Sequence, residues 1–318
     1  MKIAILGAGG CFGLNLSQYL LKQGHQVIGI GRFQPKSPPF SLEISHQNYA
    51  YHALHMVYEL DMIQDVISNQ NPDAVVNFAA LAEVPLSWKY PERYFETNVM
   101  AHIRLHALLT KEKIPLVHIG TSELYGSNNR AVDESAPLRC SSPYAVSKAA
   151  FDMYLETQKT DWLIVRPSNA YCPGQLLHRV IPRAIMTGLF GGKMPLNGGG
   201  VVKKSYIHAT DLSRGILMLI ERNQWREIYN VGPDEPTAIR DVVATVAAHY
   251  GKTLDEFCDI TPPRPNEDAC YWLDSSKIRA LGWMPEITLT DGIKDMAAWG
   301  EKYRRQLLQE SPDYKMRA

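Results

Sequence analysis

Short apolar runs alternate along the first half of this chain with amphipathic stretches long enough to form helices. The apolar runs lie at residues 3–6, 27–30, 74–78, 116–119 and 163–165, and the helical stretches at residues 14–22, 57–68, 90–109 and 144–158. Apolar strands joined by helices form parallel sheets that are covered on both faces. The sequence therefore predicts an α/β fold with a Rossmann-type, doubly wound parallel sheet.

The pattern changes near residue 168. Proline, glycine and basic residues become frequent between residues 173 and 204. Mixed short elements follow, with helical stretches at 238–249 and 289–308 and a polar end at 311–318. We expect residues 1–168 to form the first domain and residues 169–318 a smaller mixed α/β substrate lobe, with some of its strands and helices returning to the first domain.

Composition excludes several classes of partner. The 33 Lys and Arg residues balance 33 Asp and Glu, so the chain has no long-range field to hold nucleic acid. The first apolar run ends in glycines, far short of the roughly 20 residues of a membrane span, so neither a signal peptide nor a membrane partner is predicted. The five cysteines are scattered without a Cys-x-x-Cys pair, which predicts a cytoplasmic protein without a metal site.

A glycine-rich turn follows the first apolar run directly. Gly7, Gly10 and Gly13 have the Gly-x-x-Gly-x-x-Gly spacing, in which the missing side chains permit a tight turn and close approach of a phosphate. Backbone N–H groups at such a helix start hold a pyrophosphate. We expect Gly7, Gly10, Cys11, Phe12 and Gly13 to bind a dinucleotide cofactor, with the Cys11 thiol serving in packing.

The end of the second apolar run bears on the choice of cofactor. NAD sites of this type have an acidic residue for the ribose 2′-hydroxyl, whereas here Gly31 is followed by Arg32. A guanidinium pairs well with a 2′-phosphate. The sequence favours NADP, and NAD stays open because Arg32 also suits a solvated loop or a stack on adenine.

Five residues make up the predicted catalytic group. Tyr144 and Lys148 stand four residues apart and share one face of a predicted helix. An ammonium, helped by an oxidised nicotinamide, lowers the pKa of the phenol, so that a phenolate can take a proton from a sugar hydroxyl. Thr121, Ser122 and Glu123 come just past the apolar run 116–119, at the sheet edge where doubly wound folds bind ligands.

Several further segments carry a resemblance to a known family. Together with the glycine turn and the catalytic group, they are Asn77-Phe78-Ala79-Ala80, Glu96-Thr97-Asn98, Leu124-Tyr125-Gly126, Arg166-Pro167-Ser168-Asn169-Ala170-Tyr171, Ser205-Tyr206-Ile207-His208 with Asp211, Asn230-Val231-Gly232, Arg264-Pro265, Asp274-Ser275-Ser276-Lys277 and Leu281-Gly282-Trp283. Over nearly its whole length the chain resembles the extended short-chain dehydrogenase/reductases that act on nucleotide sugars. Within them it is most similar to GDP-mannose and dTDP-glucose 4,6-dehydratases.

The resemblance implies a nucleotide-sugar 4,6-dehydratase, which oxidises C4 transiently, eliminates water and returns hydride to C6. Thr121 would bond the 4-hydroxyl, Tyr144 would be its base, and Lys148 would orient Tyr144 and the nicotinamide ribose. Glu123 would be the acid/base at C5 and C6. Ser122 departs from the aspartate of the dTDP-glucose enzymes, and because a serine is no acid at neutral pH, Glu123 or a relayed water would have to expel the 6-hydroxyl.

The resemblance also implies binding residues. The added cofactor contacts would be Ala79, Ala80 and Asn98, and the substrate contacts would be Ser87, Asn169, Arg183, Lys204 and Arg264, the last three toward the diphosphate. The family usually has an aspartate after its third strand, but residues 51–54 contain no acid, so a backbone or histidine contact would replace it. His178 and His208 have no acidic neighbour at catalytic spacing and are expected to be structural.

Three alternatives remain open at this point: a UDP-glucuronate decarboxylase, a nucleotide-sugar 4-epimerase, or a non-catalytic NADP-sensing regulator on the same fold. Ser-Pro-Tyr-Ala-Val-Ser-Lys at residues 142–148 differs from the Tyr-Asp-Glu-Gly-Lys form typical of the decarboxylases. Regulators tend to lose the Tyr/Lys pair. The resemblance further implies a homodimer, formed as a four-helix bundle by the stretches 90–109 and 144–158. The nucleotide base and the hexose stay open.

Overall fold

A seven-stranded parallel sheet forms the centre of the protein. The computed structural model describes residues 1–34, 38–41, 44–263 and 270–311. The strands lie in the order β11 (Glu227–Val231), β6 (Trp162–Pro167), β5 (Leu116–Ile119), β4 (Ala74–Asn77), β1 (Lys2–Leu6), β2 (Gln26–Gly31) and β3 (Tyr49–Ala53). Every pairing is parallel, so the predicted doubly wound Rossmann sheet is confirmed.

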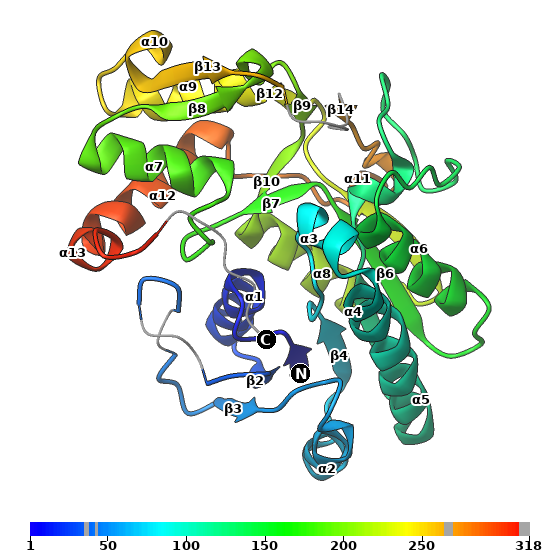
Figure 1. Ribbon diagram of the computed structural model, residues 1–318. Helices are drawn as coiled ribbons and strands as arrows, with labels where there is room; N and C mark the ends of the chain where they lie inside the picture. The colour runs from blue at the N-terminus through cyan, green and yellow to red at the C-terminus, as the bar shows by residue number, and fades with distance from the viewer. Residues whose placement is uncertain (35–37, 42–43, 264–269, 312–318) are drawn as a thin grey trace.

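Helices cover both faces of this sheet (Figure 1). Ile3 and Ile5 of β1 point toward α1 (Cys11–Lys22) and α8 (Ala209–Glu221). Ala4 and Leu6 point the other way, toward α2 (Leu60–Gln70), α5 (His102–Glu112) and α6 (Pro143–Glu156). Because successive strand residues face opposite sides, a continuous apolar run is buried on both.

A second core lies in the part of the chain after the sixth strand. It is formed by α7 (Val180–Phe190), α9 (Ile239–His249) and α12 (Leu289–Lys302), with the parallel pair β8 (Met194–Asn197) and β13 (Cys258–Thr261). Two small sheets lie nearby, β10 (Tyr206–His208) with β7 (Asn169–Tyr171), and β12 (Thr237–Ala238) with β9 (Lys203–Lys204) and β14 (Cys270–Tyr271). The segment from α8 to β11 returns to the large sheet. A domain division at residues 168 and 169 stays a prediction.

Short elements complete the fold. They are the helices α3 (Val84–Lys89), α4 (Pro91–Phe95), α10 (Leu254–Phe257), α11 (Ser276–Ala280) and α13 (Arg304–Leu307), the π-helical turn η1 (Glu96–Ala101), and the 3₁₀ turns η2 (Ser122–Tyr125) and η3 (Gly198–Gly200).

Two predicted helical stretches differ in detail from the structure. The stretch 90–109 is not one regular helix, because the π-helical turn η1 lies between α4 and α5, and such turns are frequent at functional sites. The stretch 289–308 is interrupted at Tyr303, where α12 ends. The strand β11, which extends the sheet beyond β6, was not among the predicted strands.

Candidate active site

The glycine turn after β1 forms an open cradle at the carboxyl edge of the sheet. Gly7 has φ +79°, and a Cβ there would lie 2.8 Å from the Ala79 backbone nitrogen. A Cβ on Gly13 would lie 2.5 Å from the Gly7 carbonyl oxygen, so a side chain would push α1 away from the turn. Gly10, the residue before α1, provides no side-chain cap, which suits an anion at the helix start. The cradle fits the pyrophosphate of a dinucleotide.

The end of β3, the residue that follows it, α2 and Gln34 line a cavity of about 440 Å³. Its walls include Tyr51, His52 and, from α2, Asp65. Tyr51 Oη donates to the Phe33 carbonyl at 2.6 Å, and the Arg32 guanidinium lies 4.8 Å from the centre of the Phe33 ring. Residues 51–54 contain no acid, but Asp65 of α2 also lines the cavity. His52 lines it too, where the predicted histidine contact with the cofactor could form.

The loop after β4 is held rigidly. Asn77 Oδ1 accepts from the Ala79 nitrogen at 2.9 Å, and His102 Nε2 lies 2.7 Å from the Ala79 carbonyl oxygen. Asn98, fully buried in the π-helical turn, binds both backbone groups of Leu81 and donates to Ser147 Oγ at 3.0 Å. Ala79 lies next to Gly7 of the glycine turn, and Asn98 joins the loop to α6; the cofactor contacts of Ala79, Ala80 and Asn98 stay predictions.

Thr121 stands between the two acid/base candidates. Its Oγ1 accepts from the Glu123 backbone nitrogen at 3.2 Å and so caps η2. Burial, and then the negative charge of Glu123, raise the pKa of Tyr144, while a hydrogen bond with the Thr121 side chain opposes them. The structure therefore brings Thr121, Glu123 and Tyr144 together as predicted, with Ser122 buried next to them.

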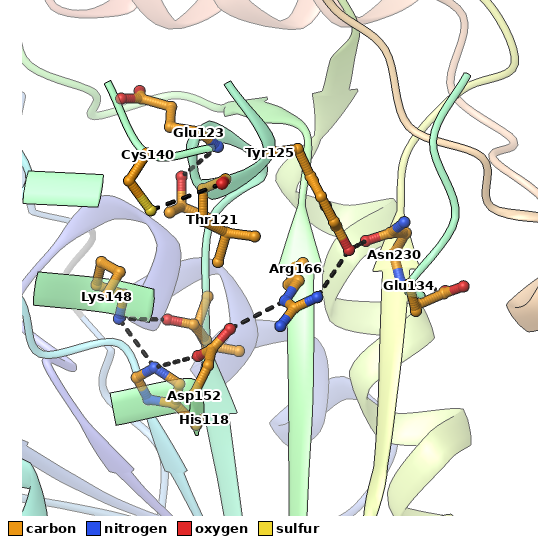
Figure 2. A network of polar contacts seen from close by, with 12 residues as sticks. His118, Thr121, Glu123, Tyr125, Glu134, Cys140, Lys148, Asp152, Arg166 and Asn230 are labelled. Carbon is orange, nitrogen blue, oxygen red and sulfur yellow. Dashed lines mark hydrogen bonds and ion pairs between the residues drawn. The ribbon is translucent and has the colours of Figure 1, made fainter. Parts of the chain in front are cut away.

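Lys148 lies one helical turn beyond Tyr144 on α6, which begins with Ser142 as its side-chain cap and Pro143 in its first turn. Lys148 Nζ donates to the Ile119 carbonyl at 2.7 Å and contacts His118 Nε2 at 3.1 Å (Figure 2). Burial lowers the pKa of Lys148 to about 8, and the charge of Asp152 opposes this shift.

The predicted substrate contacts are more dispersed. Ser87 is fully buried and donates to the Val84 carbonyl at 2.7 Å. Asn169 lies in β7 and Arg183 in α7, and both are partly exposed. Lys204 Nζ lies over the Tyr271 ring, 5.4 Å from its centre. Arg264 lies outside the described residues.

Glu83, an acidic residue that was not among the predicted site residues, lies near Tyr144. Glu83 Oε1 is 3.0 Å from His178 Nε2 and also contacts Arg179. Burial raises the pKa of Glu83, but the His178 hydrogen bond and the Arg179 charge outweigh it and lower the pKa overall. Tyr94 Oη donates to the Glu83 carbonyl at 2.6 Å, and the Tyr94 ring packs edge-on against Tyr144.

Both histidines that seemed to lack acids therefore have one. His178 contacts Glu83, and His208 Nε2 lies 3.3 Å from Asp295 Oδ2. These carboxylates are distant in the chain and were not visible as sequence neighbours, and a structural role for both histidines stays a prediction. The Cys11 thiol also has a partner from a distant part of the chain. It shares a hydrogen bond with Cys172, and this bond lowers the pKa of Cys11.

Within residues 1–34, 38–41, 44–263 and 270–311, no group of three or more His, Cys, Asp or Glu side chains is placed to hold a metal ion. None of the helices formed by these residues is both long and apolar enough to cross a membrane.

The parallel sheet, the glycine cradle and the Tyr144/Lys148 pair beside Thr121 define an extended short-chain dehydrogenase/reductase. A family model described as GDP-mannose 4,6-dehydratase matches residues 4–296. The chain belongs to this family.

Individual relatives agree with this placement. The human dTDP-D-glucose 4,6-dehydratase is 28% identical over 321 residues, which cover 94% of this chain and 89% of that protein. The crystal structure of dTDP-glucose 4,6-dehydratase from Bacillus anthracis, in complex with NAD, is 26% identical, with a TM-score of 0.86 and coverage of 96% and 98% of the two chains. A UDP-glucose 4-epimerase from Thermotoga maritima, 24% identical over 96% and 100% of the two chains, has the same fold with a TM-score of 0.86.

Proposed function

We propose that this protein is a nucleotide-sugar 4,6-dehydratase that converts a nucleotide hexose into its 4-keto-6-deoxy derivative with loss of water. The observation that carries the proposal is the position of Thr121, which hydrogen-bonds both the Tyr144 side chain and the Glu123 backbone. The Glu123 carboxylate is also close enough to Tyr144 for its charge to raise the pKa of the phenol, so a base for the 4-hydroxyl and a carboxylate for C5 are neighbours. Family membership and the named relatives support the same reaction.

The residues would divide the reaction between them. A nicotinamide bound beside the glycine cradle supplies the hydride acceptor and donor. Tyr144 would take the 4-hydroxyl proton as a phenolate; burial and Glu123 oppose that phenolate, and the positive charge of Lys148, one helical turn along α6, would have to favour it. The 4-ketone acidifies C5–H, so Glu123 can take this proton and pass it to the hydroxyl that leaves C6 as water. Ser122 has no acidic proton to contribute at neutral pH.

The cofactor would be held by Gly7, Gly10, Cys11, Phe12 and Gly13 at the cradle and by Ala79, Ala80 and Asn98 at the loop after β4. Arg32 beside the end of β2 supports NADP, while the solved relative from Bacillus anthracis holds NAD. A kinetic comparison of the two cofactors decides between them. An Arg32→Ala variant that binds NADP more weakly but NAD equally well would support NADP as the cofactor.

The nucleotide sugar would bind between the sheet edge and the smaller lobe, with Ser87 and Asn169 near the sugar and Arg183, Lys204 and Arg264 toward the diphosphate. Five free cysteines among the described residues suit a reducing cytoplasm. A homodimer is supported by four exposed apolar side chains, Phe95, Met100, Val146 and Met153, on the predicted bundle helices.

A screen of nucleotide sugars with mass detection tests the function. Loss of the mass of water from a GDP- or dTDP-hexose is expected, with solvent deuterium at C5 and the original C4 hydrogen at C6. Loss of carbon dioxide from UDP-glucuronate would identify a decarboxylase instead. A mass-neutral change of a UDP-hexose would identify an epimerase, and no change with any substrate would support a regulator.

A further inference from the structure

A chain of buried polar side chains begins at Lys148 and runs across the sheet (Figure 2). Lys148 Nζ lies 3.1 Å from His118 Nε2, and both side chains are essentially inaccessible to solvent. Burial holds the pKa of His118 well below its usual range, so its ring is neutral, and a charged Lys148 ammonium, which has donors only, requires Nε2 to be the acceptor. Together with the Ile119 carbonyl at 2.7 Å, His118 thus fixes two of the three ammonium hydrogens.

Asp152 lies one turn beyond Lys148 on α6 and is also fully buried. Its Oδ1 is 3.4 Å from His118 Nε2, and its Oδ2 accepts from Arg166 Nε at 2.9 Å. The chain continues from Arg166 to Tyr125 Oη at 2.8 Å, then to Asn230, whose backbone nitrogen donates to Glu134 at 2.7 Å.

The charge balance around Lys148 depends on Asp152. The titratable and charged groups that surround Lys148 are His118 from β5, His102 from α5, Arg166 from β6, and Tyr144 and Asp152 from α6. Burial, followed by the charge of Lys148, lowers the pKa of His102 to about 3 and that of His118 well below its usual range, so both are neutral. Burial raises the pKa of Asp152, while the charges of Arg166 and Lys148 oppose this shift and favour the carboxylate, the one acidic side chain among these groups besides the Tyr144 phenol.

We propose that Asp152 and His118 are positioning residues: the Asp152 carboxylate keeps the buried Lys148 ammonium charged, and His118 fixes where it points. This inference rests on the proposed function, in which the charge of Lys148 favours the Tyr144 phenolate. Because burial has already lowered the pKa of Lys148 to about 8, loss of the Asp152 charge would leave much of Lys148 uncharged at neutral pH.

One test measures Lys148 without any substrate. The protein is labelled with ¹³C-lysine, the Lys148 signal is assigned by its loss in Lys148→Met, and its titration is followed by NMR. In Asp152→Asn the Lys148 midpoint should fall by at least about one pH unit. Glu134→Gln, at the other end of the same chain of contacts, should leave it in place. An unchanged midpoint in Asp152→Asn would overturn the proposal.

A second test uses the pH profile of turnover on the nucleotide sugar that the screen identifies. In Asp152→Asn the alkaline fall of kcat should move to lower pH, with activity recovering as the pH is lowered. A rate reduced equally at every pH would mean a merely structural role and overturn the proposal. Absence of turnover in the wild-type protein would instead refute the proposed function and leave the NMR result intact.

His118 variants keep the proposal testable if Asp152→Asn does not fold. His118→Gln retains an oxygen acceptor for Lys148, whereas His118→Leu does not. The Leu variant should lower the Lys148 midpoint and raise KM for the cofactor, and the Gln variant should restore both in large part. Equal midpoints in the Leu variant and the wild type would refute the role of His118.

Discussion

Glu83 and His178 lie 95 residues apart in the chain and meet at 3.0 Å, close to the ring that packs against Tyr144. Glu83 precedes α3 and His178 lies just before α7, so the contact joins the loop after β4 to the segment that leads into α7. The contact therefore lies beside Tyr94, whose hydroxyl bonds the Glu83 carbonyl and whose ring packs against Tyr144.

Glu83→Gln should lower the free energy of unfolding by about 2 kcal/mol at pH 7, since a charge-assisted hydrogen bond is lost. The pKa of Glu83 is lower in the folded protein, so its stabilisation is present above its unfolded pKa and disappears as pH falls through the folded one. Denaturant unfolding should therefore show wild type and variant converging in acid. Glu92→Gln, at an exposed position, is the control, and parallel curves at all pH values would contradict the prediction.

Tyr144→Phe should abolish turnover while cofactor binding persists, because only the proton-accepting oxygen is removed. Steady-state kinetics and a cofactor titration measure the two properties. Tyr154→Phe removes a hydroxyl from the same helix, away from Thr121, and should stay active. Tyr144→Phe activity within about tenfold of wild type would be incompatible with a base at this position.

Glu123→Gln should permit oxidation at C4 but block elimination, since the amide cannot take the C5 proton. Reduced nicotinamide should then accumulate when substrate is added, and deuterium from solvent should not enter C5. If reduced cofactor fails to appear, exchange at C5 decides whether Glu123 is not the base or C4 oxidation is itself impaired.

Gly10→Ala should fold normally yet bind the dinucleotide at least about tenfold more weakly, or ~1.4 kcal/mol. A Cβ on Gly10 meets only the Gly7 carbonyl oxygen, at 3.4 Å, so the added methyl points toward the space the pyrophosphate would use. Calorimetric titration and thermal unfolding measure affinity and stability. Gly13→Ala is the contrast, because its Cβ would lie 2.5 Å from Gly7 oxygen and should lower Tm as well.

Val146→Glu combined with Met153→Glu should convert the proposed dimer to monomers, because two charges would be buried in the bundle. Light scattering should then report a mass near 35.8 kDa for the variant and about twice that for wild type at micromolar concentration. A wild-type mass of 35.8 kDa would exclude the dimer.

Local patterns in the sequence were sufficient for much of the fold. The run 3–6 is buried on both faces as β1, and Tyr144 and Lys148 share one face of α6, because strand and helix periods act over a few residues. The π-helical turn at Asn98 was not predictable in this way, since it accompanies side-chain bonds to Leu81 and Ser147 from other elements. The strand β11 was missed because it pairs with β6 only after a long excursion of the chain.

The sequence by itself determined the parallel α/β class, the glycine turn after the first strand and the catalytic Tyr/Lys spacing, since each is a matter of residue type and short spacing. Only the tertiary structure decided which ionisable side chains meet: Glu83 with His178, and Asp152 with His118 and Arg166. The physical reason is that electrostatic interaction depends on distance and burial in space. Residues distant in the chain acquire those only when the sheet and its helices pack together.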